Sequence, residues 1–239
     1  MNYLNEIPEK DNRATQHIDA KIEKRDIPVA IGELMGKDDR FVMIGGHADT
    51  TYVSPGAVDN TAGVATVMEI ARQLAPYKDD LKHTIKFAAW SGEEEGLFGS
   101  TLYVDAHREE INTSLIAYLN LDMNHINLAR GVGCSINSNN NETLSVFENI
   151  TAFVKASNPD FEKYQIGFGY WEGLTSSDQA PFAKMGKDFA CFWGSGCTEY
   201  HTPHDTLEFV TPESLAFSGM IYGSYALYLA ADLGAGRKS

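Results

Sequence analysis

Hydrophobic and polar positions divide the chain into two kinds of segment. Short apolar runs bounded by glycine or polar clusters are typical of buried strands, and they occur at 27–36, 41–46, 83–90, 114–123 and 188–193. Longer segments with apolar residues three or four positions apart predict helices at 61–75, 97–109, 142–157, 179–186 and 211–233. In the helix at 61–75 the spacing predicts a buried face made of Val64, Val67, Met68, Ala71 and Leu74.

Strands that alternate with helices indicate an α/β fold, in which a mixed, mostly parallel central sheet is covered by helices on both faces. Ligands of such sheets bind beyond the carboxyl ends of the strands. Acidic residues, histidines and a tyrosine follow four of the predicted strands: His47 and Asp49, Glu93 to Glu95, Asp122, and Tyr200 with His201. We therefore expect one edge of the sheet to collect a cluster of carboxylates and imidazoles.

Each part of this cluster also has an ordinary interpretation. A single His-x-Asp is more often a surface turn than a metal site, although residues two apart in an extended segment point the same way, so that Asp49 can orient the His47 ring. The "EEE" run is usually solvated, but here it separates two segments that require burial. Asp122 lies inside the apolar run "YLNLDM", where a carboxylate is costly to bury unless a cation compensates it. Asp122 is therefore the strongest single indication of a metal site.

Length, composition and charge narrow the range of functions. The 239 residues are 43% hydrophobic and 22% charged, the balance of an ordinary globular protein with a sizeable core. The formal net charge of -14, without clustered Lys and Arg, argues against a nucleic-acid partner. No apolar run approaches the ~20 residues that cross a bilayer, so we expect no membrane span. The N-terminal segment lacks the apolar centre of a signal peptide, and the localisation stays undetermined.

The three cysteines leave the redox state open. Cys191 and Cys197 could close a small disulfide around "FWGSG", with Cys134 left over, or they could be two free, buried thiols. The compartment is therefore not decided by the cysteines.

Five blocks of the sequence, in this order and at these intervals, resemble the di-zinc metallopeptidases (aminopeptidases) of family M28: "GGHADT", "SPGAVDNTAGVA", "WSGEEEGLFGS", "YLNLDM" and "EYHTPHDT". The resemblance covers about residues 26 to 231. It implies the zinc exopeptidase fold, which is phosphorylase/hydrolase-like, and a peptide substrate. It also implies a catalytic zinc peptidase domain over 26–239, preceded by a charged N-terminal arm or linker remnant over 1–25.

The resemblance implies five protein ligands for two zinc ions, with cobalt or manganese as possible substitutes. The ligands would be His47 and Asp122 for one metal, Glu94 and His201 for the other, and Asp59 as the bridge. Mixed nitrogen and oxygen ligands suit zinc, and five ligands for two metals leave coordination positions open for catalysis. The family also commonly has a cis peptide after the bridging acid, here between Asp59 and Asn60.

Three further residues receive roles from the resemblance. Glu93 would be the general base, which takes a proton from water and passes it to the leaving amine. Tyr200 would donate a hydrogen bond to the tetrahedral oxyanion, or alternatively it packs on the wall of the site. Asp49 would orient His47.

Substrate specificity is less well defined. Candidates for the wall that receives the first substrate side chain, each with a core position as the alternative, are Tyr170, Trp171, Phe192 and Trp193. Asp178 matches a position that frames the pocket in the family. Gln179 stands where many relatives have histidine, and Ser176 and Ser177 offer no basic residue. This departure leaves the preferred substrate undetermined.

Three classes of function compete. The prediction is an aminopeptidase that hydrolyses the N-terminal peptide bond with a water activated by two zinc ions, and a carboxypeptidase or dipeptidase of the same family would use the same site. A single-zinc glutaminyl cyclase of the same fold is the second class, and the five intact ligands argue against it. The third, a non-enzymatic receptor-like domain, would be expected to have a degraded ligand set. The oligomeric state and whether the chain is an excised or minimal catalytic domain are not predicted.

Overall fold

The protein is described by a computed structural model of residues 15–21, 23–172, 176–195 and 197–231. The predicted N-terminal arm lies partly outside these residues, and its described part is exposed and contains no helix or strand. The end of the last predicted helix, at 232–233, also lies outside them. No helix of the described chain is long and apolar enough to span a membrane.

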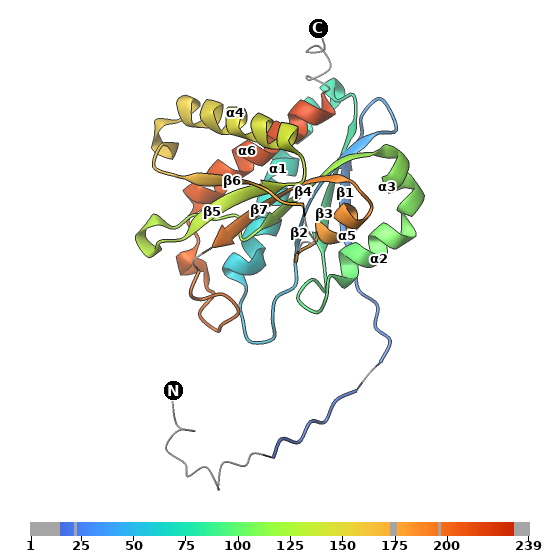
Figure 1. Cartoon of the computed structure of the whole chain (residues 1–239), viewed down its shortest axis with the longest axis vertical. Coiled ribbons are helices and arrows are strands. Elements are labelled where there is room, and N and C mark those ends of the chain that lie inside the picture. The colour runs from blue at the N-terminus through green and yellow to red at the C-terminus, as the bar shows by residue number, and fades with distance from the viewer. Residues whose placement is uncertain (1–14, 22, 173–175, 196, 232–239) are drawn as a thin grey trace.

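A central sheet organises the described chain, with its strands in the order β1-β3-β2-β4-β7-β5-β6 (Figure 1). The strands are β1 (Ala30–Leu34), β2 (Phe41–His47), β3 (Thr84–Trp90), β4 (Leu115–Asp122), β5 (Gly133–Ser138), β6 (Ile166–Tyr170) and β7 (Asp188–Ser195). The helices are α1 (Ala62–Leu74), α2 (Phe98–Ala106), α3 (Arg108–Ser114), α4 (Asn141–Ser157), α5 (Ala180–Lys184) and α6 (Pro212–Ala230).

Four neighbouring strands at the centre of the sheet run parallel. β3, β2, β4 and β7 pair in parallel, whereas β1 is antiparallel to β3 and β5 is antiparallel to β7. The register aligns His47 with Trp90 and Asp122 with Trp193 at the ends of the strands. The predicted mixed, mostly parallel sheet is therefore confirmed, and the four strands that precede the polar clusters end at the same edge.

Helices cover both faces of the sheet. Because successive residues of a strand point to opposite faces, Val42 and Ile44 of β2 join a core cluster with α1, α4 and α6, while Phe41 and Met43 join a second cluster with α2, α3 and α5. Figure 1 shows these two groups of helices on opposite sides of the strands. The predicted covering of both faces is confirmed.

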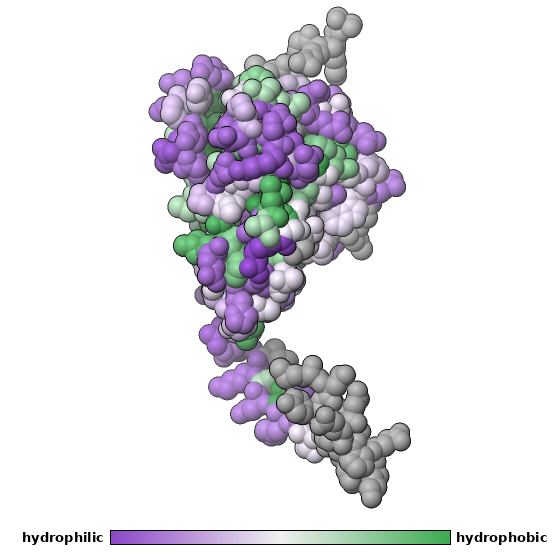
Figure 2. Space-filling view, turned by 90° about the vertical axis from the view of Figure 1, so that its left-hand side faces the viewer, coloured by the Kyte–Doolittle hydropathy of each residue, from purple (hydrophilic) through white to green (hydrophobic). Residues whose placement is uncertain are grey.

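The sequence did not predict β5 and β6. Their segments, "GCSINS" and "IGFGY", contain serine, asparagine and glycine between the apolar residues, which weakens the strand pattern. They form the outer part of the sheet, with β6 at its edge. Figure 2 views the molecule from that side, where hydrophilic side chains dominate the upper part and hydrophobic ones gather in the middle.

The predicted buried face of α1 is wrong at one position. Met68 is 67% exposed, whereas Val67, Ile70 and Leu74 are buried. The helix is turned because Gly63 faces β4: a Cβ at this glycine would lie 2.5 Å from the carbonyl oxygen of Leu121. This close backbone approach, rather than the apolar spacing alone, sets which side of α1 faces the sheet.

Two other expectations are resolved by the structure. The helix predicted at 97–109 is two helices, α2 and α3, which meet at the non-helical residue His107. All three cysteines are free thiols; Cys134 and Cys191 are buried and Cys197 is half-buried. The disulfide alternative is therefore wrong.

Candidate active site

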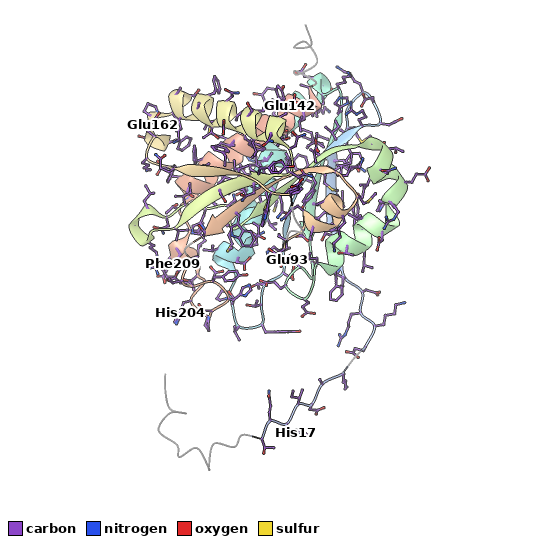
Figure 3. All side chains as sticks on the ribbon, viewed as in Figure 1. His17, Glu93, Glu142, Glu162, His204 and Phe209 are labelled. Carbon is purple, nitrogen blue, oxygen red and sulfur yellow. The ribbon has the colours of Figure 1, made fainter. Side chains whose placement is uncertain are left out.

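Loops from four parallel strands meet at the carboxyl-end edge of the sheet, at the lower end of the folded domain in Figure 1. His47 is the last residue of β2 and Asp122 is the last residue of β4. Glu94 and His201 lie in the loops that follow β3 and β7. Figure 3 labels Glu93 at this edge. Residues that are distant in the sequence are thereby brought to one place.

Asp59 lies at the centre of the cluster and contacts both histidines. Its Oδ1 is 3.1 Å from His47 Nε2, and its Oδ2 is 3.1 Å from His201 Nε2. His47 Nε2 is also 3.8 Å from Asp122 Oδ1, and His201 Nε2 is 3.0 Å from Glu94 Oε2. The five side chains therefore form two trios that share Asp59, and within each trio the candidate ligand atoms lie within 4.8 Å of one another.

The charges of this cluster fit divalent cations. Burial alone lowers the pKa of His47, but the Asp122 and Asp49 carboxylates raise it well above its ordinary value. Burial and the nearby Asp59 carboxylate raise the pKa of Glu94, whose buried Oε1 has no hydrogen-bond partner among the described residues. Crowded, buried carboxylates need positive charge, and a set of imidazole and carboxylate ligands matches the preference of zinc.

Asp49 fixes both His47 and the loop after β3. The Nδ1 of His47 lies 3.0 Å from the backbone carbonyl oxygen of Asp49, and the Asp49 carboxylate is farther away, at 3.7 Å. Because a carbonyl only accepts hydrogen bonds, Nδ1 carries a proton, and Nε2, which faces Asp59 and Asp122, is the nitrogen that would bind a cation after losing its own proton. The Asp49 carboxylate accepts the backbone N–H groups of Glu93 and Glu94, each at 3.2 Å. Asp49 thus orients the imidazole chiefly through its main chain.

Asn60 joins the Asp59 segment to the end of β4. The Asp59–Asn60 peptide is cis, as the resemblance implied. The buried Asn60 side chain donates to the carbonyl of Leu121 at 2.9 Å and accepts the N–H of Met123 at 3.1 Å. These two residues flank Asp122, so Asn60 holds the backbone on both sides of this carboxylate.

A second buried side chain, that of Asp205, joins the Asp59 segment to the loop of His201. No local pattern of the sequence predicted a positioning role for the side chains of Asn60 and Asp205. Asp205 lies in the same block, "EYHTPHDT", as His201, but its hydrogen-bond partners are 146 and 147 positions away. Only the folded chain reveals this contact.

Two acidic side chains beside the cluster have raised pKa values. Burial, together with the negative charges of Asp122 and Asp178, raises the pKa of half-buried Glu93 to about 8. Burial also raises the pKa of Asp178 to about 7, although its interaction with Ser100 lowers it. A carboxyl group that titrates near neutral pH is suited to proton transfer.

Tyr200 lies against the second trio. Its ring stacks on the His201 imidazole, with the ring centroids 3.6 Å apart, and 41% of the residue is exposed. Burial and the carboxylates of Asp59 and Glu94 raise the pKa of Tyr200 to about 12. The hydroxyl group is therefore protonated at neutral pH and is available as a hydrogen-bond donor.

The four aromatic residues considered for the pocket wall separate into two groups. Phe192 is fully buried and its ring contacts Tyr222 edge-on at 5.7 Å, so it belongs to the core. Trp193, the next residue of β7, points to the opposite face and is half-buried. Tyr170 is half-exposed and Trp171 is half-buried. These last three remain candidates for contact with a substrate.

Gln179, which stands where the family often has histidine, makes buried hydrogen bonds within the protein. It is buried, and its Oε1 accepts a hydrogen bond from Asn120 Nδ2 at 2.9 Å. The same amide group donates to Ser177 Oγ at 2.9 Å. The segment that contains Asp178 is therefore anchored to β4, two residues before Asp122.

Two trios of candidate metal ligands that share a carboxylate at the edge of an α/β sheet are an arrangement suited to a metal-dependent hydrolase. The chain belongs to Peptidase family M28, whose sequence profile matches residues 30–225.

Similar proteins include enzymes that act at either end of a peptide chain. Aminopeptidase YwaD from Bacillus subtilis (strain 168) is 33% identical over 186 residues, which are 75% of this chain and 39% of that protein. A probable glutamate carboxypeptidase, LAMP1 from Arabidopsis thaliana, is 31% identical over 206 residues, which are 78% of this chain and 28% of that protein. The structure of BSAP, a zinc aminopeptidase from Bacillus subtilis, matches with a TM-score of 0.68 and 28% identity, over 84% of this chain and 50% of that chain. The chain thus spans half or less of the length of these relatives.

Proposed function

We propose that the protein is a metal-dependent exopeptidase, namely an aminopeptidase that hydrolyses the N-terminal peptide bond of peptides with a water activated by two zinc ions. The observation that carries the proposal is the position of the Asp59 carboxylate, whose two oxygens each lie 3.1 Å from the Nε2 of a different histidine, His47 or His201. The similarity to a zinc aminopeptidase of known structure supports both the metal and the end of the peptide that is cleaved.

The two trios would each hold one ion. The residues assigned to the first ion are His47 and Asp122, those assigned to the second are Glu94 and His201, and Asp59 is shared. When bound, the ions would lower the pKa of water and polarise the carbonyl group of the scissile bond. The same nitrogen and oxygen ligands would accept cobalt or manganese as substitutes.

Glu93 is assigned the proton transfer. In the metal-free protein burial raises the pKa of its carboxyl group above the ordinary value, and a carboxyl group whose pKa is raised toward neutrality can take a proton from water and give it to the leaving amine. Its backbone N–H is fixed by Asp49, next to that of the ligand Glu94. Tyr200 is assigned the hydrogen bond to the developing oxyanion, because its hydroxyl group stays protonated beside His201.

The acidic surroundings favour a substrate with a free amino terminus. The α-ammonium group would lie among carboxylates that include Glu93 and Asp122, where opposite charge favours binding. The first substrate side chain would contact the aromatic residues Tyr170, Trp171 and Trp193.

A carboxypeptidase or dipeptidase that uses the same centre is the second candidate. The similarity to LAMP1, a probable glutamate carboxypeptidase, favours it. Such an enzyme needs a cationic group to hold the terminal carboxylate of its substrate, and Ser176, Ser177 and Gln179 supply none in the segment beside the site.

A hydrolysis screen tests the proposal and separates the two candidates. The substrates are aminoacyl nitroanilides, their N-acetylated counterparts, peptides that are blocked at the amino end and free at the carboxyl end, and peptides that begin with glutamine, each with and without a chelator. An aminopeptidase cleaves the free-amine substrates, ignores the acetylated ones, and loses activity with the chelator. Cleavage of N-blocked peptides at their free carboxyl end would instead establish the carboxypeptidase, and formation of pyroglutamate with one bound zinc would establish the cyclase.

Variants of the "EEE" run test the individual roles. We expect Glu93→Gln to lower kcat by about 10² to 10⁴ with an unchanged metal content, and Glu94→Ala to lose bound metal. Glu95→Gln is the matched control, because Glu95 accepts a hydrogen bond from the exposed Tyr52 and is in neither trio. Equal effects of the three substitutions would contradict the assignment.

A further inference from the structure

Asp205 spans the gap between two ligand-bearing segments. It is fully buried, and its Oδ1 accepts the backbone N–H of Val58 at 2.8 Å, while its Oδ2 accepts that of Asp59 at 3.0 Å. Its carbonyl oxygen accepts the N–H of Ala57 at 3.2 Å. Three hydrogen bonds thus attach one residue of the His201 loop to three consecutive residues that end at the shared carboxylate.

These contacts require a carboxylate. The N–H groups of Val58 and Asp59 lie at the start of an irregular turn, Ala57–Thr61, which leads into α1 and in which Asp59 and Asn60 have non-helical φ and ψ angles. As at the start of a helix, these N–H groups need an acceptor from outside the turn. A carboxylate offers two oxygens and a negative charge to two buried donors, and such charge-assisted hydrogen bonds are the strong ones. An asparagine at this position would offer one acceptor and would turn an N–H₂ group toward the other donor.

The loop that contains Asp205 is itself held in a compact turn. The N–H of Asp205 donates to the carbonyl of Thr202 at 3.2 Å, and the N–H of Thr202 donates to that of Glu199 at 3.0 Å. His201 lies inside this turn with a left-handed φ of 57°. Figure 3 shows His204, the neighbour of Asp205, at the same lower edge of the sheet as Glu93. The position of Asp205 therefore sets the position of His201 relative to Asp59.

The other links between ligand segments use different side chains. Asn60 connects the Asp59 segment to the backbone around Asp122, and Asp49 connects the end of β2 to the backbone of Glu94. Asp205 acts on the pair of Asp59 and His201. Its removal should affect the trio that includes His201 more than the trio that includes Asp122.

We propose that Asp205 is a positioning residue for the second metal of the pair: by binding the N–H groups of Val58 and Asp59, it holds the bridging carboxylate and His201 at the spacing that the Asp59, Glu94 and His201 trio requires. This inference rests on the proposed two-metal function. It assigns to Asp205 a role in the relative affinity of the two sites, beyond capping the turn before α1.

Stepwise titration of the metal-free protein with Co²⁺, followed by the visible absorption of the bound ion, tests the proposal. Residues that hold metal ligands in place typically contribute 10- to 100-fold to metal affinity. Asp205→Asn should therefore lower the affinity for one of the two Co²⁺ ions by about tenfold or more and leave the affinity for the other within about threefold of the wild type. The absorption of the weakened site should change as its ligand geometry loosens, and kcat should fall more than KM rises.

Two control variants separate positioning from general stability. Glu208→Gln removes a negative charge from an exposed side chain three residues away. Ile70→Val removes one buried methylene from α1 without altering a ligand segment. Both should titrate like the wild type. If Asp205→Asn is not folded by circular dichroism, Asp205→Glu, which keeps both oxygens but displaces them, is titrated in its place with the same criteria.

Two results would overturn the proposal. One is that the Asp205 variant binds both Co²⁺ ions with affinities within about threefold of the wild type. The other is that both affinities fall equally, in step with the melting temperature of the metal-free protein. A wild-type protein that takes up fewer than two Co²⁺ ions would instead refute the proposed two-metal function. Failure of the function and failure of the inference about Asp205 are therefore distinguishable.

Discussion

Substitution of Tyr118 by phenylalanine should destabilise the protein through two other side chains. The Tyr118 hydroxyl accepts a hydrogen bond from Trp90 Nε1 at 2.8 Å and donates one to Asn120 Oδ1 at 2.9 Å. All three residues are fully buried. Asn120 in turn donates to Ser177 and Gln179, so the chain of hydrogen bonds reaches from β3 to the segment beside the site.

The expected loss of stability follows from the two buried groups that lose their hydrogen-bond partner. Tyr118→Phe leaves the ring in place against Phe182, 4.1 Å between centroids, and removes only the hydroxyl. The indole N–H of Trp90 and the amide oxygen of Asn120 then remain buried and unpaired, and each such group costs about 1–3 kcal/mol. The two together lower the free energy of unfolding by roughly 2–6 kcal/mol. For a chain of this length even the lower limit corresponds to a melting temperature about 4 °C lower.

Urea unfolding followed by circular dichroism measures the effect in the metal-free protein. Tyr103→Phe is the matched control, because Tyr103 also contacts the Trp90 ring, at 5.2 Å, but is only partly buried, and its loss of a hydroxyl should cost less than about 0.5 kcal/mol. If Tyr118→Phe destabilised the protein no more than the control, the buried hydrogen-bond chain would not be stabilising and the reasoning would be refuted.

Three further predictions concern the core, pH and metal. Phe192→Ala should lower the free energy of unfolding by about 3–5 kcal/mol without changing the order of preferred substrates, whereas Trp193→Ala should change that order; denaturation and a substrate panel check both. In the folded, metal-free protein the pKa of Asp178 is raised to about 7. The free energy of unfolding should therefore fall as pH rises from about 4 to 7, by at most ~1.4 kcal/mol per pH unit for this group. Urea unfolding at several pH values should show that the free energy of unfolding depends less on pH in Asp178→Asn than in the wild type. Zinc at 100 times its Kd should add about 2.7 kcal/mol per bound ion to the stability of the metal-free protein. Calorimetry would record this as a higher melting temperature, and no increase would contradict binding to the folded state.

Secondary structure was predictable from the sequence where a single local pattern dominated. The buried parallel strands β2, β3 and β4 are short, largely apolar runs, and the long helix α6 begins at a Thr-Pro-Glu start signal, so local patterns identified them. The face of α1 was not predictable in the same way, because Gly63 approaches the backbone of β4 and turns Met68 outward. Apolar spacing carries no information about how closely two backbones approach.

The sequence by itself determined the set of polar residues at the strand ends and, through the rule that parallel strands share a carboxyl edge, that they would gather there. Tertiary structure decided how they are held. Asn60, Asp205 and Gln179 have partners between 59 and 147 positions away, and no local pattern marks them. Hydrogen bonds depend on distance and angle between groups that only the folded chain brings together, whereas strand and helix patterns follow from periodicities that neighbouring residues already carry.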